Sequence, residues 1–109
     1  MASARRCPVG RSVGEAGRYD DLVGKARRSL MQRDFDAALA QLELAVDDDD
    51  RRPEAFNLLG VVEEVRGERS EARTYWRLAL VLKPDYEPAE ENLLRVTVRP
   101  RPPGGLSLG

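Results

Sequence analysis

Asp47–Asp50 form a run of four consecutive carboxylates, followed by Arg51 and Arg52. Carboxylates this close together could bind a cation. A calcium loop, however, spaces its acidic ligands along about 12 residues with a central glycine and a distal glutamate, and this run has neither. We therefore interpret the run as a solvated connection between helices. An acidic docking spot for a basic partner, or for the arginine-rich ends of the chain itself, is the alternative.

The side chains that most often carry out catalysis are scarce in this chain. It contains no histidine, and Cys7 is its only cysteine, which excludes Ser-His-Asp and Cys-His nucleophile systems within the chain. The glycine-containing stretch GRSVGEAG lacks the Lys and Ser/Thr of a phosphate-binding loop. Other carboxylates that could take part in chemistry, namely Asp34, Asp36, Glu63 and Glu64, occupy positions typical of solvated helix surfaces. We expect no enzymatic activity, no bound metal and no cofactor.

The net charge of −1 conceals an acidic middle between two basic ends. Residues 1–18 contain four arginines and one glutamate, and residues 96–109 contain two arginines and no acid. Both ends are rich in glycine and proline, so each buries too little apolar area to offset the entropy of ordering, and we predict flexible tails. The basic residues are too sparse for a strong phosphate footprint, so we expect no nucleic-acid binding. Contact with nucleic acid or an anionic surface through these tails remains an alternative function.

No apolar stretch is long enough to span a bilayer, so we expect no membrane span. The arginines near the start are not followed by the apolar segment of a secretory signal. We therefore expect a cytoplasmic protein.

The middle of the chain repeats in residue type, with a period equal to the separation between Leu22 and Phe56. When the chain is shifted by that period, small residues coincide with small residues and large apolar residues with large ones. The coinciding pairs are Leu22 and Phe56, Ala26 and Gly60, Ala38 and Ala72, Leu42 and Trp76, and Ala45 and Ala79. Apolar residues three and four apart predict two amphipathic helices in each unit. Pro53, Gly67 and Pro84 mark a helix start and two helix ends in the second unit.

The second unit resembles the tetratricopeptide repeat family, whose unit of about 34 residues is a pair of helices. The matching positions are Phe56, Leu59, Gly60, Ala72, Trp76, Ala79 and Pro84. Glu63 departs from the family pattern, which has an aromatic or apolar residue there. The first unit matches more weakly, and the stretch DYEPAEENLLRVTV resembles the first helix of a third unit.

The resemblance implies an all-α fold, namely a short α-solenoid of two antiparallel helical hairpins and a C-terminal capping helix. The expected units are residues 19–52 and 53–86, and the capping helix is residues 87–98. Residues 1–18 and 99–109 are then the flexible basic N-terminal tail and the Pro/Gly-rich C-terminal tail.

The resemblance also implies a concave groove, lined by the first helix of each unit, that holds a peptide or a partner's helix. The groove positions carried over from the family are Val23, Arg27, Leu30, Met31, Asn57, Leu58, Val61, Glu64, Val65, Glu91, Asn92 and Arg95. The groove is expected to be largely apolar, with Arg27 and Arg95 pairing to acids. Two alternatives are that a tail of this chain fills the groove and that some of these positions are core. The family's basic clamp for chaperone tails is not expected, because Val23, Arg27 and Leu58 occupy its places.

These expectations describe a non-enzymatic protein–protein interaction module, acting as an adaptor, an assembly factor or a small subunit of a larger complex. Two units and a cap are at the lower limit for a stable stack. The capping helix also carries more apolar residues than one buried face requires, which are Leu93, Leu94, Val96 and Val98. Exposed apolar patches mark association surfaces, so a self-associating scaffold, or homo-oligomer, is the alternative.

Overall fold

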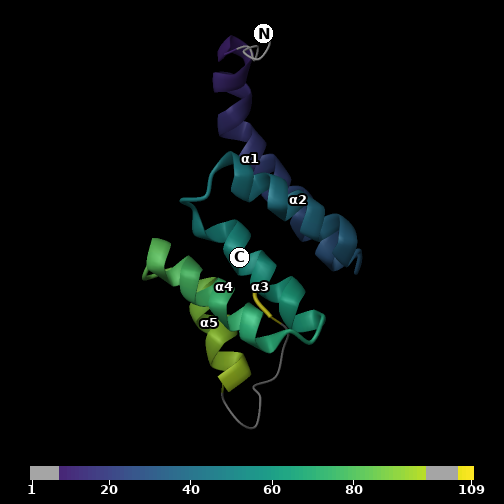
Figure 1. The fold of residues 1–109 in the computed structure, drawn as a ribbon, viewed down its shortest axis with the longest axis vertical. Coiled ribbons are helices and arrows are strands. Elements are labelled where there is room, and N and C mark those ends of the chain that lie inside the picture. The colour runs from purple at the N-terminus through teal and green to yellow at the C-terminus, as the bar shows by residue number, and fades with distance from the viewer. Residues whose placement is uncertain (1–7, 98–105) are drawn as a thin grey trace.

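The structure, a computed structural model, describes residues 8–97 and 106–109, and the side chains of residues 18–96 and 106–109. All regular secondary structure in this described part is helical, which confirms the all-α prediction. The helices are α1 (Pro8–Met31), α2 (Phe35–Asp48), α3 (Pro53–Val65), α4 (Arg69–Leu82) and α5 (Glu87–Thr97). Helix α1 packs most extensively on α2, and α3 on α4, while α5 packs on α4 and touches α3 (Figure 1).

The helix boundaries recur with the period of the sequence repeat. Helices α1 and α3 end exactly one period apart, at Met31 and Val65. Helices α2 and α4 both begin and end one period apart, and α3 and α5 also begin one period apart. The repeat in residue type is therefore accompanied by a repeat in backbone structure.

The ends of α1 and α3 share one hydrogen-bond pattern. After α3, the Gly67 N–H donates to the carbonyl three residues back (3.1 Å) and the Glu68 N–H to the carbonyl five residues back (2.8 Å). After α1, Arg33 and Asp34 make the same bonds, at 3.0 and 2.8 Å. This arrangement requires a left-handed backbone at the first of the two residues. Gly67 adopts it with a φ of 88°, and Arg33 adopts it with a φ of 63° although it is not a glycine.

Helix α1 begins at Pro8, well before the predicted start at residue 19. Proline suits the first turn of a helix because its missing N–H has no partner there. Once residues 19–31 are held as helix by packing, adding further residues at the N-terminal end avoids a new nucleation step. Residues 1–7, which include Cys7, lie outside the described residues, as do residues 98–105 of the predicted capping helix and C-terminal tail.

A tryptophan seated on a glycine joins α3 to α4. Trp76 is fully buried, and its indole lies directly over Gly60, where a side chain would overlap the ring. The Trp76 Nε1–H donates to the Asn57 carbonyl oxygen at 3.0 Å. Ala72 and Ala79 on α4 are also fully buried. The small residues of the repeat therefore lie where two helices approach closely.

Tyr19 ties α1 to the start of α3. The Ala55 N–H, one of the first-turn amides that a helix leaves without an internal partner, donates to the Tyr19 hydroxyl oxygen at 3.0 Å. The residue before α3, Arg52, makes no side-chain cap and instead places its guanidinium 4.3 Å from the centre of the Tyr19 ring. Burial raises the pKa of Tyr19 above its usual value. A side chain from one unit thus caps a helix of the next.

The four aspartates lie at the end of α2 and in the connection to α3. Helix α2 ends at Asp48, and the Asp49 carboxylate accepts a hydrogen bond from the Arg51 N–H at 3.0 Å. Among the described residues, no group of three His, Cys, Asp or Glu side chains is placed to hold a metal ion. None of the helices in the described part of the chain is long and apolar enough to cross a membrane.

Candidate functional site

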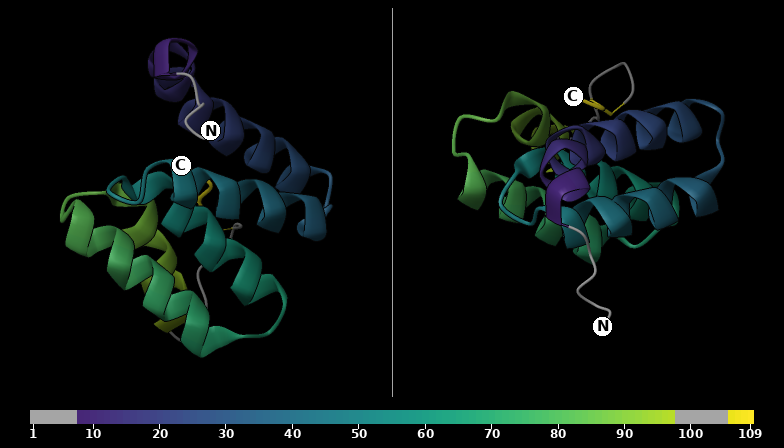
Figure 2. Two further views of the ribbon diagram at one scale, coloured as in Figure 1. Left: turned by 45° about the horizontal axis from the view of Figure 1, so that its top comes forward. Right: turned by 90° about the horizontal axis from the view of Figure 1, so that it is seen from above.

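The 106–109 segment, Leu-Ser-Leu-Gly, lies against the body of the protein and touches residues from α1, α3 and α5 (Figures 1 and 2). We call the surface that holds it the groove. Sequence composition predicted a flexible tail over residues 99–109, whereas the structure places residues 106–109 against the helices. Apart from prolines, Leu106 and Leu108 are the only apolar side chains after residue 98. Both pack against the hydrophobic core.

Two asparagine side chains, Asn57 on α3 and Asn92 on α5, hold the main chain of Ser107. We call them the amide pair. The Ser107 N–H donates to the Asn92 side-chain oxygen at 2.6 Å. The Ser107 carbonyl oxygen accepts from the Asn92 and Asn57 side-chain nitrogens at 2.9 and 3.0 Å. The amide pair is itself joined, because the Asn92 nitrogen donates to the Asn57 oxygen at 2.8 Å. An asparagine amide offers donor and acceptor groups side by side, which matches the polar groups of a peptide unit.

The position of Asn57 follows from the packing beneath it. Asn57 lies one helical turn before Gly60 and Val61 on α3. Its carbonyl oxygen accepts the hydrogen bond from Trp76, so the ring that fills the space over Gly60 also binds the backbone of Asn57. Both members of the amide pair are fully buried. With the segment in place, their side chains are oriented by hydrogen bonds to each other and to Ser107.

Arg27 binds the end of the segment, and Tyr86 lies beside it. The Arg27 Nε–H donates to the Leu108 carbonyl oxygen at 3.0 Å. Gly109 has a φ of 93°, and a Cβ atom built there would lie 3.0 Å from the Tyr86 hydroxyl oxygen and 3.2 Å from an Arg27 terminal nitrogen. Burial raises the pKa of Tyr86, and the nearby Glu54 carboxylate raises it further. The phenol is therefore neutral at ordinary pH.

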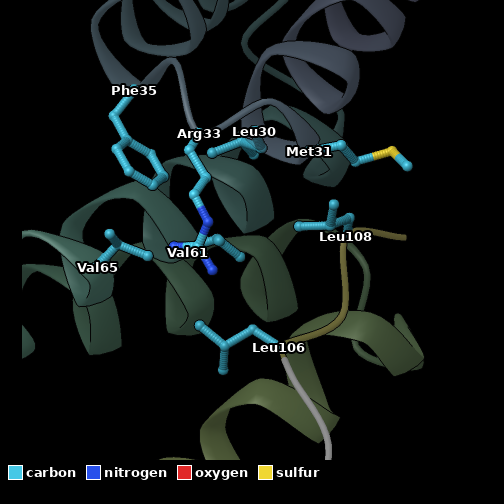
Figure 3. A pocket seen from close by; sticks show the side chains of 8 residues that line it. All are labelled: Leu30, Met31, Arg33, Phe35, Val61, Val65, Leu106 and Leu108. Atoms are coloured by element: carbon cyan, nitrogen blue, oxygen red, sulfur yellow. The ribbon is translucent and has the colours of Figure 1, made fainter.

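An apolar hollow lies beside the two leucines of the segment (Figure 3). It measures about 420 Å³ and is lined by Leu30, Met31, Arg33, Phe35, Val61, Val65, Leu106 and Leu108. Met31 and Val65 on its rim remain 75% and 49% exposed. In Figure 3 the Arg33 side chain extends from the end of α1 across the hollow toward Val61. The leucines of the segment therefore leave part of this apolar surface uncovered.

Seven of the twelve groove residues expected from the resemblance lie at the 106–109 segment or the hollow. Arg27, Asn57 and Asn92 bind the segment by hydrogen bonds, and Leu30, Met31, Val61 and Val65 line the hollow. The other five have different surroundings. Val23 and Leu58 are buried in the core, Glu64 lies 3.7 Å from the Arg69 guanidinium, Glu91 is exposed and Arg95 is partly buried.

Sequence reasoning missed Tyr86, Phe35 and Arg33. It offered a tail of this chain in the groove only as an alternative, and it did not single out residues 106–109. The segment did carry a signal, because an apolar residue at every second position is the pattern of an extended chain with one buried face. The amide pair carried another signal: Asn-Leu-Leu occurs at residues 57–59 and again at residues 92–94. No motif singled out Tyr86, which ends the expected second unit.

The apolar patch expected on the capping helix is only partly exposed. Leu94 is 60% exposed, Leu93 is partly buried and Val96 is buried. Val98 lies outside the described residues. On the neighbouring α4, Val81 is 75% exposed.

No protein-family model matches the chain, and no curated protein or solved structure matches it. The resemblance to the tetratricopeptide repeat family therefore rests on the residues of the chain and stays an expectation. In chemical terms, the polar groups that converge on the segment are two neutral amides, a guanidinium and a neutral phenol. The two amides and the guanidinium form hydrogen bonds with the main chain of the segment, and the phenol lies beside Gly109.

Proposed function

We propose that this chain is a non-enzymatic protein–protein interaction module that binds an extended segment of a partner protein in the groove between α1, α3 and α5. The observation that carries the proposal is the amide pair, which binds both main-chain polar groups of Ser107. In this proposal α1 with α2 and α3 with α4 are antiparallel helical hairpins, stacked as a short α-solenoid that α5 caps. The recurrence of helix boundaries with the repeat period supports that arrangement.

The buried amide pair supports peptide binding on energetic grounds. A buried polar group without a hydrogen-bond partner costs about 1–3 kcal/mol. With Ser107 removed, the Asn92 oxygen and one hydrogen-bond donor on each amide nitrogen would need other partners. An apolar residue at either position would avoid this requirement. Two asparagines at this place therefore suit a protein that repeatedly binds a peptide unit.

The chemistry of the groove favours binding over catalysis. The converging groups are amides, a guanidinium and a phenol whose pKa is raised by burial. None of these is a general base near neutral pH, and none is an activated nucleophile. We therefore propose an adaptor, an assembly factor or a small subunit of a larger complex, rather than an enzyme.

A peptide-display selection on the immobilised full-length chain tests this proposal. The chain should carry Leu106→Ser and Leu108→Ser, which weaken the docking of its own segment without touching the groove. A second target adds Asn57→Ala and Asn92→Ala, and a matched control adds Thr74→Ala, which removes an exposed hydroxyl on α4. Circular dichroism establishes that each target is folded.

We expect a family of related peptides to be enriched on the first target and on the Thr74→Ala control, and lost on the double asparagine variant. A target that carries Arg27→Gln in place of the asparagine changes should bind the same peptides more weakly. Arg27 donates a hydrogen bond to the segment from outside the core. Selection of no related peptides, or equal selection on the asparagine variant, would contradict the proposed function.

A further inference from the structure

Among the described residues, the groove binds the main chain of Ser107, the second residue of the 106–109 segment, and makes no hydrogen bond to its side chain. The amide pair binds the peptide N–H and carbonyl of Ser107. The Ser107 hydroxyl oxygen only accepts a hydrogen bond from the Gly109 N–H within the segment itself, at 3.4 Å. The groove can therefore hold any chain in the same extended conformation whose neighbouring side chains fit.

The groove favours apolar side chains at the two positions that flank Ser107. In an extended chain, alternate side chains point to the same face, and Leu106 and Leu108 both face the hollow (Figure 3). Both leucines are only partly buried, and about 420 Å³ of the hollow remains beside them. A larger apolar side chain at the position of Leu106 would cover more of this surface and so bind more tightly. The chain's own segment is thus a partial match for the groove.

The groove favours glycine at the fourth position of the segment, that of Gly109. Gly109 adopts a positive φ, which side chains disfavour. A Cβ atom there would also press on the Tyr86 hydroxyl and the Arg27 guanidinium, at 3.0 and 3.2 Å. Both of these side chains are held, Arg27 by its hydrogen bond to Leu108 and Tyr86 by burial. Alanine at this position is therefore disfavoured by strain and by contact.

From these contacts we infer that the 106–109 segment is a built-in competitor for the groove, and that the partner is an extended protein segment with two apolar side chains flanking one residue, followed by glycine. This inference rests on the proposed function. The 106–109 segment is covalently joined to α5 through residues 98–105, so its effective concentration is on the order of 1 mM. If the segment alone has a dissociation constant of about 0.1 mM, its presence would lower the apparent affinity of a competing partner by about tenfold.

Fluorescence anisotropy with a dye-labelled peptide tests the inference. The probe has the sequence of residues 101–109, Arg-Pro-Pro-Gly-Gly-Leu-Ser-Leu-Gly. Two variant probes carry phenylalanine at the position of Leu106 or alanine at the position of Gly109. The proteins are the unaltered full chain, the Leu106→Ser/Leu108→Ser chain, and a Leu44→Ser/Leu94→Ser chain that changes two exposed leucines outside the hollow.

We expect the Leu106→Ser/Leu108→Ser chain to bind the probe about tenfold more tightly than the unaltered chain, and the Leu44→Ser/Leu94→Ser chain to match the unaltered one. The phenylalanine probe should bind more tightly than the original, and the alanine probe about tenfold more weakly.

If the unaltered and Leu106→Ser/Leu108→Ser chains bind the probe with equal affinity, the 106–109 segment does not compete for the groove. Binding of the probe in the groove would still stand. Unchanged affinity for the alanine probe would overturn the glycine requirement. Binding by neither chain would overturn the inference and the proposed function together. A concentration-dependent dimer that disappears in the Leu106→Ser/Leu108→Ser chain would mean that the segment docks between copies, which overturns the built-in arrangement.

Discussion

Replacing Gly60 with alanine tests the close contact that joins α3 to α4 beneath the groove. A Cβ atom at this position would overlap the Trp76 indole, lying 2.6 Å from its Cδ1 and 2.7 Å from its Cε2. The indole is fully buried, so solvent offers no space for it to move into. Either the ring shifts within the core or the two helices separate.

The expected loss of stability follows from three contributions. Forcing an extra carbon into a packed core costs about 1–3 kcal/mol. A displaced Trp76 ring also weakens its hydrogen bond to the Asn57 carbonyl, which contributes about 1 kcal/mol. Alanine favours the helix over glycine by about 1 kcal/mol and offsets part of this loss. We expect the free energy of unfolding to fall by about 1–3 kcal/mol, a large share of the roughly 5–15 kcal/mol typical of a domain.

Gly24→Ala is the matched control, because Gly24 also lies within a helix but has open space around it. A Cβ atom there would meet only the end of the Arg28 side chain, at 3.9 Å. We expect this variant to gain up to about 1 kcal/mol from helix propensity. Urea unfolding, followed by circular dichroism and by the fluorescence of the single tryptophan, measures both variants. If Gly60→Ala is as stable as Gly24→Ala, the close contact between Gly60 and Trp76 is not present in the protein.

Three further predictions concern helix ends and one buried phenol. Arg33→Gly should raise the free energy of unfolding by about 1 kcal/mol, since glycine adopts the positive φ of this position without strain; thermal unfolding at an unchanged temperature would mean that Arg33 is not strained. Asp34→Ala should cost about 1 kcal/mol in urea unfolding, because the Asp34 carboxylate caps α2 at the Ala37 N–H. Glu68→Ala, at the equivalent position of α4 where no side chain caps the helix, should cost less, and equal losses would contradict the assignment. Because burial raises the pKa of Tyr19 in the folded protein, the neutral phenol stabilises the fold fully below the unfolded pKa of about 10, and stability should fall as the pH rises above it. Unfolding at a series of alkaline pH values should show a smaller fall in Tyr19→Phe, and an identical pH profile in the two proteins would refute this reasoning.

The repeat shows what residue pattern alone can predict. Amphipathic spacing within the repeat anticipated the two helices of each unit, Pro53 and Gly67 anticipated the start and end of α3, and the resemblance implied the fifth helix. Amphipathic spacing, proline and glycine act within a few residues of the chain, so their effects can be deduced from neighbouring positions. The start of α1 was predicted less well, because a helix that packing has already nucleated extends through residues whose own preferences are weak.

The arrangement of side chains in the groove could not be predicted from the residue pattern. The resemblance pointed to Arg27, Asn57 and Asn92, yet it did not say that the two amides would bind one peptide unit together. That pairing depends on the relative placement of α3 and α5, which pack on α4 and touch each other. The position of Tyr86 beside Gly109 likewise depends on how the helices pack, and no sequence motif marks it.

The sequence by itself determined an all-helical chain with a repeating pair of helices, a largely apolar set of first-helix residues and no histidine or cysteine pair for catalysis. The tertiary structure alone decided what lies in the groove. Composition averages over the Pro/Gly-rich tail and predicts disorder, whereas Leu106 and Leu108 gain their stability from surfaces far away in the chain. Only folding brings Arg27, Asn57 and Asn92 within hydrogen-bond distance of one short segment, because those contacts join residues up to 81 positions apart.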